Sequence, residues 1–165
     1  MRILVISDIH GMYDRFISLM DETGYEPARD LLVLLGDYID RGPEPIKVIE
    51  KVMALVDNGA VALKGNHEQL FVDAFDDLDS GERGSLLNHY WNGGEVTWKK
   101  FLALDSGDRP GIINFIRKLP LTYVLDDYIF VHGGLDTSRP LDRQNSEKLL
   151  WYRSEFIYSA PLQGK

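Results

Sequence analysis

Cysteine is absent from this chain of 165 residues. Its absence excludes disulfide bonds, thiolate metal ligands and a cysteine nucleophile, and it fits a reducing compartment. Long apolar runs are missing as well: the first one, Ile3–Ile6, stops at Ser7 and Asp8 and is too short for the core of a signal peptide. No segment reaches the length of a membrane span. We therefore expect a soluble, cytoplasmic protein that does not bind a membrane.

Basic residues are few, and they form no run. The formal net charge is −8. Nucleic acid is not expected as a partner, because phosphate contacts need clustered lysines or arginines. An acidic chain that handles phosphate needs a local positive centre, and a bound metal ion is the simplest one.

What the chain does contain is one pattern used four times: a short apolar run, then polar residues able to bind a metal, then glycine. The four segments are RILVISDIHG, LLVLLGDYIDRG, AVALKGNHE and YIFVHGGL. Continuous apolar runs predict strands that are buried on both faces. Helical patterns follow the first three runs, over residues 16–20, 46–56 and 67–78. This alternation predicts an α/β fold in a single domain over residues 1–165.

Residues 79–109 interrupt the alternation, and their glycines and mixed aromatic residues predict an inserted lobe over the site. Two more helices are expected, over residues 110–119 and over residues 145–157 with Ser146 as N-cap. In or near these segments, His89 is expected to be structural, and a role in the substrate lobe is the alternative. The tryptophans are expected to be packing anchors: Trp91, Trp98 and Trp151.

The polar clusters lie where a ligand site is expected, because such sites form at the carboxyl ends of neighbouring strands in α/β folds. Asp8 and His10 are one residue apart, so their side chains point the same way from an extended strand end. Carboxylates, imidazoles and one amide oxygen, without sulfur, suit divalent Mn, Fe or Zn. Asp37 follows the strand expected at the centre, where two ions could share its carboxylate. The other two donors are Asn66 and His132.

The second cluster has two charged residues beyond Asp37. The guanidinium of Arg41 is a planar fork suited to phosphate oxygens. Asp40 is suited to hold an imidazole in one tautomer, and His67 is the available imidazole. Taken singly, each residue also suits an ordinary turn or a surface ion pair. Four such strand ends in one chain favour a site.

The segments DIHG, GDYIDRG, GNHE and HGGL, in this order, resemble the calcineurin-like metallophosphoesterases, and more narrowly their bacterial and phage phosphoprotein phosphatases. The resemblance extends from Met1 to about Phe156 when LLWYRSEF is counted. It implies a four-layer α-β-β-α sandwich with two divalent ions, Mn²⁺ first and Fe or Zn as alternatives. The implied reaction is one in-line attack by metal-bound hydroxide, without a phosphoenzyme.

The resemblance also implies a role for each matching residue. Asp8 and His10 would bind the first metal, and Asp37 would bridge. Asn66 and His132 would bind the second. His67, paired with Asp40, would protonate the leaving oxygen. The residues implied to hold phosphate oxygens are Arg41, Asn66 and Arg153.

One departure from the family concerns the second metal. The family adds a histidine in a GHT-like motif well after the WxR segment, whereas none of the four histidines here lies beyond His132. We therefore expect a fragment without this last ligand and without the C-terminal strands of the sandwich, and an incomplete second metal site is the alternative.

The expected function is hydrolysis of phosphoserine and phosphothreonine in proteins. A symmetrical bis(5'-nucleosyl)-tetraphosphatase is the nearest alternative, because its motifs are nearly the same. A non-catalytic phosphate-binding relative is a second alternative, supported by the missing histidine. A nuclease or phosphodiesterase is a third, disfavoured by the acidic charge. The expected partner is a phosphorylated protein or a small phosphoester, and the oligomeric state is left open.

Overall fold

The computed structural model describes residues 1–81 and 83–158. The predicted domain over residues 1–165 and the predicted lobe over residues 79–109 therefore include positions, 159–165 and 82, that lie outside the described residues.

Three strands form a parallel sheet in the order β1-β2-β3: β1 is Arg2–Ile6, β2 is Asp30–Leu34 and β3 is Val61–Ala62. The register pairs Ile6 with Leu34, and Leu34 with Ala62. All three strands thus end at the same level, and the segments that follow them leave from one edge of the sheet. The strand before Asp37 is the central one, as the sequence predicts.

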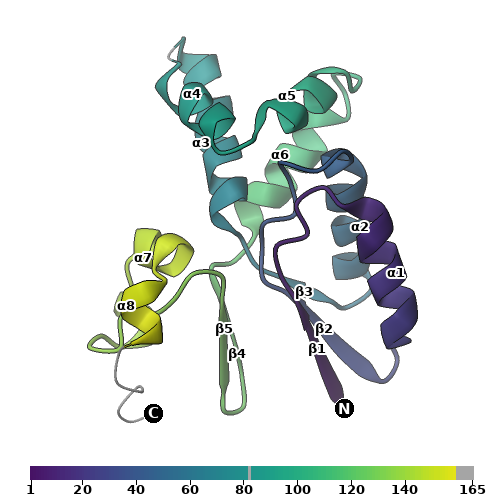
Figure 1. Cartoon of the computed structure of the whole chain (residues 1–165), viewed down its shortest axis with the longest axis vertical. Helices are drawn as coiled ribbons and strands as arrows, with labels where there is room; N and C mark the ends of the chain where they lie inside the picture. Colours follow the sequence, from purple (N-terminus) through teal and green to yellow (C-terminus); the bar gives the residue numbers. More distant parts are fainter. Residues whose placement is uncertain (82, 159–165) are drawn as a thin grey trace.

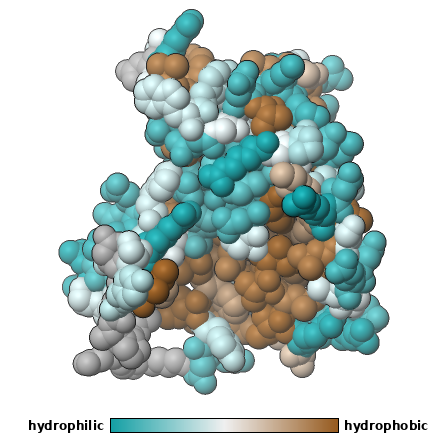
Figure 2. Space-filling model, in the orientation of Figure 1, coloured by the Kyte–Doolittle hydropathy of each residue, from teal (hydrophilic) through white to brown (hydrophobic). Residues whose placement is uncertain are grey.

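Burial differs between the strands. Four of the five residues of β2 are buried, whereas β1 has no buried residue and Val5 is 47% exposed. The prediction of strands buried on both faces is thus right for β2 and wrong for β1, which is an edge strand. Figure 2 shows a broad hydrophobic area on this side of the molecule, over the three-stranded sheet.

Helices follow the strands where the periodicity predicts them: α1 (Tyr13–Thr23), α2 (Pro45–Asp57) and α3 (Asn66–Ser80). Pro45 starts α2, where its missing N–H is of no consequence. After α3 come α4 (Gly84–Trp91), α5 (Glu95–Leu102) and α6 (Arg109–Lys118). The core lies between β2, α2, α3, α5 and α6, and side chains of α5 such as Trp98 and Phe101 belong to it.

The fourth apolar run forms half of a hairpin that the sequence pattern did not predict in full. Strand β4 (Thr122–Leu125) pairs antiparallel with β5 (Tyr128–Val131), and Asp126 turns between them with a φ of 48°. The chain continues through a short 3₁₀ helix, η1 (Leu141–Arg143), into α7 (Ser146–Trp151) and α8 (Ser154–Ile157).

The helix predicted over residues 145–157 is therefore two helices, since the chain is extended at Tyr152. The predicted cap is one residue late as well. Asn145, not Ser146, is the N-cap, because its side chain accepts hydrogen bonds from the backbone N–H groups of Glu147 and Lys148.

The layers follow one another across Figure 1: α7 and α8, then the β4–β5 hairpin, then the three-stranded sheet, then α1 and α2. This is the helix–sheet–sheet–helix order that the resemblance implies, with a second sheet of two strands. No helix in the described ranges has the length and apolar character that crossing a membrane requires.

The tryptophans differ from one another. Trp98 is 2% exposed and is the expected packing anchor. Trp91 is 83% exposed and Trp151 is 44% exposed, so the same expectation is wrong for these two.

Candidate metal centre

Four loops converge at the carboxyl ends of the strands, and backbone hydrogen bonds join three of them. Beyond β1 and β2, the N–H of His10 donates to Asp37 O at 2.8 Å, and the N–H of Gly42 donates to His10 O at 3.0 Å. On the other side, the His67 N–H donates to the Asp37 carboxylate at 3.1 Å. The loop that carries Asp37 is thus bonded to the loops on both sides of it, so it is central in the site just as β2 is central in the sheet.

Two glycines permit this close approach. A Cβ on Gly42 would overlap the carbonyl oxygen of His10, and a Cβ on Gly65 would overlap the backbone and carboxylate of Asp37. Both glycines belong to the motifs GDYIDRG and GNHE. Any other residue at either position would push the loops apart.

The backbone at the site is unusual. Left-handed φ values occur at six non-glycine residues of the described chain, and Asp126 in the hairpin is the only one away from the site. The other five are predicted site residues: Asp8 (56°), His10 (44°), Asp37 (58°), Asp40 (71°) and Arg41 (63°). Strained backbone of this kind concentrates at functional sites, where surrounding contacts hold it in place.

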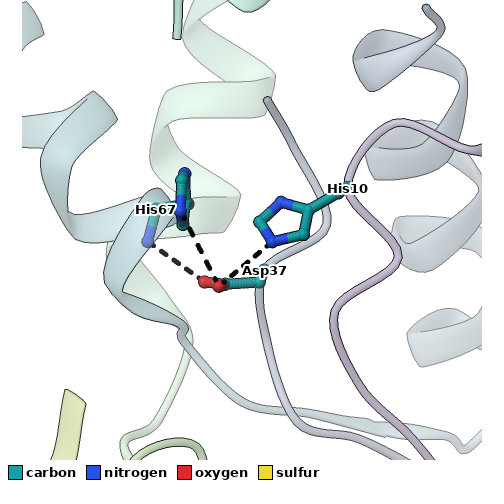
Figure 3. A group of neighbouring side chains, drawn as sticks. All are labelled: His10, Asp37 and His67. Atoms are coloured by element: carbon teal, nitrogen blue, oxygen red, sulfur yellow. Dashed lines mark hydrogen bonds and ion pairs between the residues drawn. The ribbon is translucent and has the colours of Figure 1, made fainter. Parts of the chain in front are cut away.

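Three imidazoles face the buried carboxylate of Asp37. Its Oδ2 lies 3.5 Å from His10 Nε2 and 3.9 Å from His67 Nε2, and its Oδ1 lies 3.5 Å from His132 Nε2. Figure 3 shows His10 and His67 directed at this carboxylate from opposite sides. His10 and His132 thus approach different oxygens, which is the arrangement expected of a carboxylate shared by two cations.

Hydrogen bonds fix the tautomer of both imidazoles. The Nδ1–H of His10 donates to Ile39 O at 3.0 Å, and the Nδ1–H of His132 donates to Leu35 O at 2.8 Å. Each ring therefore directs the lone pair of Nε2 at Asp37, which is the usual orientation of a metal-binding histidine. Burial is the main cause that lowers the pKa of His10, so this ring is held neutral, as a ligand must be.

Asn66 adds an oxygen to the same group. Its Oδ1 lies 2.9 Å from His132 Nε2. Two acceptor atoms at this separation repel each other unless a proton or a cation lies between them. The oxygen and nitrogen donors of Asp37, Asn66 and His132 thus fit a divalent ion.

Asp8 lies at the open side of the group. Its side chain is 53% exposed, and its Oδ1 is 4.0 Å from His10 Nε2. The ligand atoms of His10, Asp37 and His67 lie within 4.8 Å of one another, and Asp8 adjoins this group through His10. The structure therefore brings all five predicted metal ligands to one place, with His67 beside them.

Arg41 spans two imidazoles. Its Nη1 lies 2.9 Å from His10 Nε2, and its Nη2 lies 2.9 Å from His67 Nε2. Because a guanidinium only donates, both ring nitrogens act as acceptors here. A cation bound to His10 would need the same lone pair, so Arg41 has to leave His10 when a metal binds there.

Asp40 is fully buried and accepts three side-chain hydrogen bonds. Its Oδ2 accepts from His67 Nδ1 at 2.6 Å and from His89 Nε2 at 2.7 Å, and its Oδ1 accepts from Thr97 Oγ1 at 2.5 Å. Burial raises the pKa of Asp40, but the hydrogen bonds from His67, His89 and Thr97 outweigh it, and the net pKa is lowered. The predicted pairing of Asp40 with His67 is present. The purely structural role predicted for His89 leaves out its contact with this carboxylate.

Glu68 is a third buried carboxylate at the site, after Asp37 and Asp40, and the sequence analysis assigned it no role. It accepts the backbone N–H groups of Asp37 and Tyr38 at 2.8 Å each, and that of Gly65 at 2.9 Å. Burial raises the pKa of Glu68 to about 7. The sequence does contain a signal for this role, because a Glu three residues after an N-cap is half of a capping box.

Arg153 is the one predicted residue that stands apart. It lies between α7 and α8 with its side chain exposed. Within residues 1–81 and 83–158, no hydrogen bond or ion pair joins this side chain to the other predicted site residues. The structure does not bring it into contact with the group.

Comparisons with known proteins bear on the family and the fold of the chain. A family model for calcineurin-like phosphoesterases matches residues 1–161. The symmetrical bis(5'-nucleosyl)-tetraphosphatase of Aromatoleum aromaticum is 32% identical over 136 residues, which are 82% of this chain and 45% of that protein. Further relatives carry the same name. The chain thus spans less than half the length of the curated relatives it matches.

Solved structures show the same fold. A metallophosphoesterase from Sphaerobacter thermophilus matches with a TM-score of 0.59 and 23% identity, over 93% of this chain and 50% of that one. A protein serine/threonine phosphatase from Saccharomyces cerevisiae matches with a TM-score of 0.58 and 21% identity, over 90% and 48%. At these identities the likeness concerns the fold alone.

Proposed function

Because the chain belongs to the calcineurin-like phosphoesterases, we propose that it carries the site of a metal-dependent hydrolase of small phosphate compounds, first among them dinucleoside tetraphosphates, whose phosphoanhydride bond it would cleave. The observation that carries the proposal is the carboxylate of Asp37, with one oxygen toward His10 and the other toward His132.

The candidate metal ligands divide into two sets, one for each cation position. Asp8, His10 and Asp37 would hold one ion, and Asp37, Asn66 and His132 the other. Their oxygen and nitrogen donors suit Mn²⁺, with Fe or Zn as alternatives. Such ions activate a water molecule and neutralise charge on a phosphoryl group.

The chain's own residues would then bind the substrate and move a proton. Arg41, released from His10, would present its fork to two phosphate oxygens. Once Arg41 has moved, His67 Nε2 is free to carry the proton that the leaving oxygen needs, while its Nδ1–H stays on Asp40. Asn66 would contact a phosphate oxygen as well. Arg153 could join only after a rearrangement.

The substrate class rests on the relatives. Curated relatives at 28–32% identity carry the name symmetrical bis(5'-nucleosyl)-tetraphosphatase, whereas the protein serine/threonine phosphatase matches through its fold only. This favours the alternative of the sequence analysis over its main expectation, phosphoprotein hydrolysis, which stays a prediction.

The test is to incubate the 165-residue chain with Mn²⁺ and three substrates in parallel: diadenosine tetraphosphate, a phosphothreonine peptide and bis(p-nitrophenyl) phosphate. We expect ADP as the only nucleotide product from the first, and little release from the other two. Phosphate release from the peptide that is faster than ADP formation would favour the protein phosphatase hypothesis instead. Cleavage of the diester would point to a phosphodiesterase. Asp37→Asn is the blank.

A further inference from the structure

The buried carboxylate of Asp40 accepts hydrogen bonds from other side chains besides His67, the residue that it is expected to orient. The four side chains that meet there, Asp40, His67, His89 and Thr97, are each exposed by 1% or less. His89 and His67 donate to the same oxygen, at 2.7 and 2.6 Å. This local network is closed to solvent, so the position of each proton in it can be inferred from the hydrogen bonds.

The protons can be assigned one by one. The N–H of Asp40 donates to Thr97 Oγ1 at 3.0 Å, which leaves the hydroxyl hydrogen of Thr97 for Asp40 Oδ1. His89 Nδ1 is buried and has no hydrogen-bond partner in the described part of the chain. A proton there would be unsatisfied, so His89 carries its proton on Nε2 and donates it to Asp40.

These donors determine what His67 can do. With two hydrogen bonds already accepted from His89 and Thr97, the ionised carboxylate of Asp40 is favoured despite its burial. An ionised Asp40 holds the Nδ1–H of His67, and Nε2 then faces the metal ligands and Arg41. Without the two donors, Asp40 would be a buried charge with one partner, and protonation would remove its hold on His67.

The two hydrogen-bond donors, His89 and Thr97, belong to one segment, which also contacts the loop of Asp40 and Arg41. His89 lies in α4 and Thr97 in α5, and the turn between these helices accepts the N–H of Arg41 at Gly93 O, at 3.1 Å. Gly94 packs on the ring of His89 so closely that a Cβ would overlap it. Residues 89–97 therefore support Asp40 and Arg41 together, both of which have left-handed backbone.

We propose that His89 and Thr97 are positioning residues, which keep Asp40 ionised and oriented so that His67 acts as the proton donor to the leaving group. This inference rests on the proposed function for its catalytic consequence. A packing role alone, through the contacts of His89 with Phe71 and Trp98, would not need the short bond to Asp40.

The test compares variants that remove each donor with variants that keep it. Thr97→Val and His89→Leu remove the O–H and the N–H. Thr97→Ser keeps the hydroxyl, and His89→Gln keeps an N–H near the position of Nε2. Thr97→Val keeps the shape of the side chain but also removes the acceptor of the Asp40 N–H, so thermal unfolding of each variant checks that it is folded before turnover is compared. Asn88→Ala, on the exposed side of α4, is the control.

The readout is kcat with Mn²⁺ on phenyl phosphate, a poor leaving group, and on 2,4-dinitrophenyl phosphate, which needs no proton. We expect Thr97→Val and His89→Leu to lower kcat on phenyl phosphate by about tenfold or more, and kcat on the dinitrophenyl ester by less than about threefold. Thr97→Ser and His89→Gln should restore most of the loss. Equal losses on both esters, or no loss, would overturn the proposal.

A second readout is independent of turnover. Nitrogen-15 NMR of the histidine side chains reports which ring nitrogen carries the proton. In the unchanged chain, His67 should be protonated at Nδ1, and Thr97→Val should shift this signal while that of His132 stays in place. If the chain hydrolyses neither diadenosine tetraphosphate nor the two esters but the His67 signal responds, the positioning holds and the proposed function fails. If the signal does not respond, the positioning is wrong whatever the turnover.

Discussion

The carboxylate of Asp37 lies 3.5 Å from Nε2 of His132, a contact that joins the loop after the parallel sheet to the end of the β4–β5 hairpin. The same imidazole donates its N–H, at Nδ1, to Leu35 O, just after the end of β2. The two sheets are therefore connected at the site itself, and changes to Asp37 test both halves of it.

Asp37→Asn should abolish binding at both cation positions. The amide keeps the hydrogen bond from the His67 N–H but lacks the charge that two cations would share. We expect kcat to fall by at least about a hundredfold, because metal ions supply several kcal/mol of charge stabilisation. Calorimetric titration with Mn²⁺ measures the stoichiometry, and Asp105→Asn, at an exposed position, is the control. Near-normal turnover would contradict a shared carboxylate.

His67→Asn should slow the reaction most for poor leaving groups. The variant has no ring nitrogen that can carry a proton to the leaving oxygen, whereas Asp40 keeps His89 and Thr97 as partners. We expect a loss of about a hundredfold on phenyl phosphate and a much smaller loss on 2,4-dinitrophenyl phosphate. A uniform loss across the two esters would remove His67 from the acid role.

Arg41→Gln should separate phosphate binding from metal binding. The guanidinium donates to His10 Nε2, so its removal frees a metal ligand and takes a positive charge from the site. Inhibition by inorganic phosphate should weaken by about tenfold, which is the size of one charge-assisted hydrogen bond. Mn²⁺ should bind at least as tightly as before. Weaker Mn²⁺ binding together with unchanged phosphate inhibition would refute this assignment.

Glu68→Ala should destabilise the fold. The substitution leaves the buried N–H groups of Asp37, Tyr38 and Gly65 without their acceptor. We expect the free energy of unfolding, measured with urea, to fall by about 3 kcal/mol. Glu50→Ala, on the exposed face of α2, should change it by less than about 0.5 kcal/mol. Equal effects of the two changes would show that Glu68 does not hold these loops.

Acid should lower the stability of the fold through Asp30, the first residue of β2. The hydrogen bond from Arg2, then that from the Glu26 N–H, lowers the pKa of Asp30 to about 2. A carboxyl group whose pKa is lowered on folding stabilises the fold above its unfolded pKa of about 3.9, and this contribution is lost as the pH falls. The melting temperature should therefore fall between pH 4 and about 2 more steeply in the unchanged chain than in Asp30→Asn. Parallel slopes would rule out the pair as the cause, and Asp105→Asn is again the control.

The meeting of the metal-ligand candidates at the ends of the strands could be predicted from the sequence because each apolar run and the polar residues after it form a local pattern. Each apolar run ends in its donors, and parallel strands must end together. The central place of Asp37 follows from the same reasoning. The position of His132 on a hairpin of its own does not, because strand pairing across sheets depends on contacts far apart in the chain.

The surroundings of Asp40 could not be predicted for a related reason. His89 and Thr97 lie on two short helices whose packing against Asp40 has no local sequence signal. Glu68 differs, since its place after Gly65 is a recognisable capping pattern that predicts a bond to Gly65 N–H. Its further bonds to the loop of Asp37 depend on the tertiary fold.

The left-handed backbone at Asp8, His10, Asp37, Asp40 and Arg41 restricts which replacements these positions accept, apart from any chemistry. Side chains branched at Cβ are the worst suited to this conformation, and Gly, Asn and Asp are the best. In a library of substitutions at these five positions, the folded fraction should follow the torsional preference of each amino acid, while activity follows its charge. Sorting such a library first for folding and then for turnover would separate the two kinds of selection at each position.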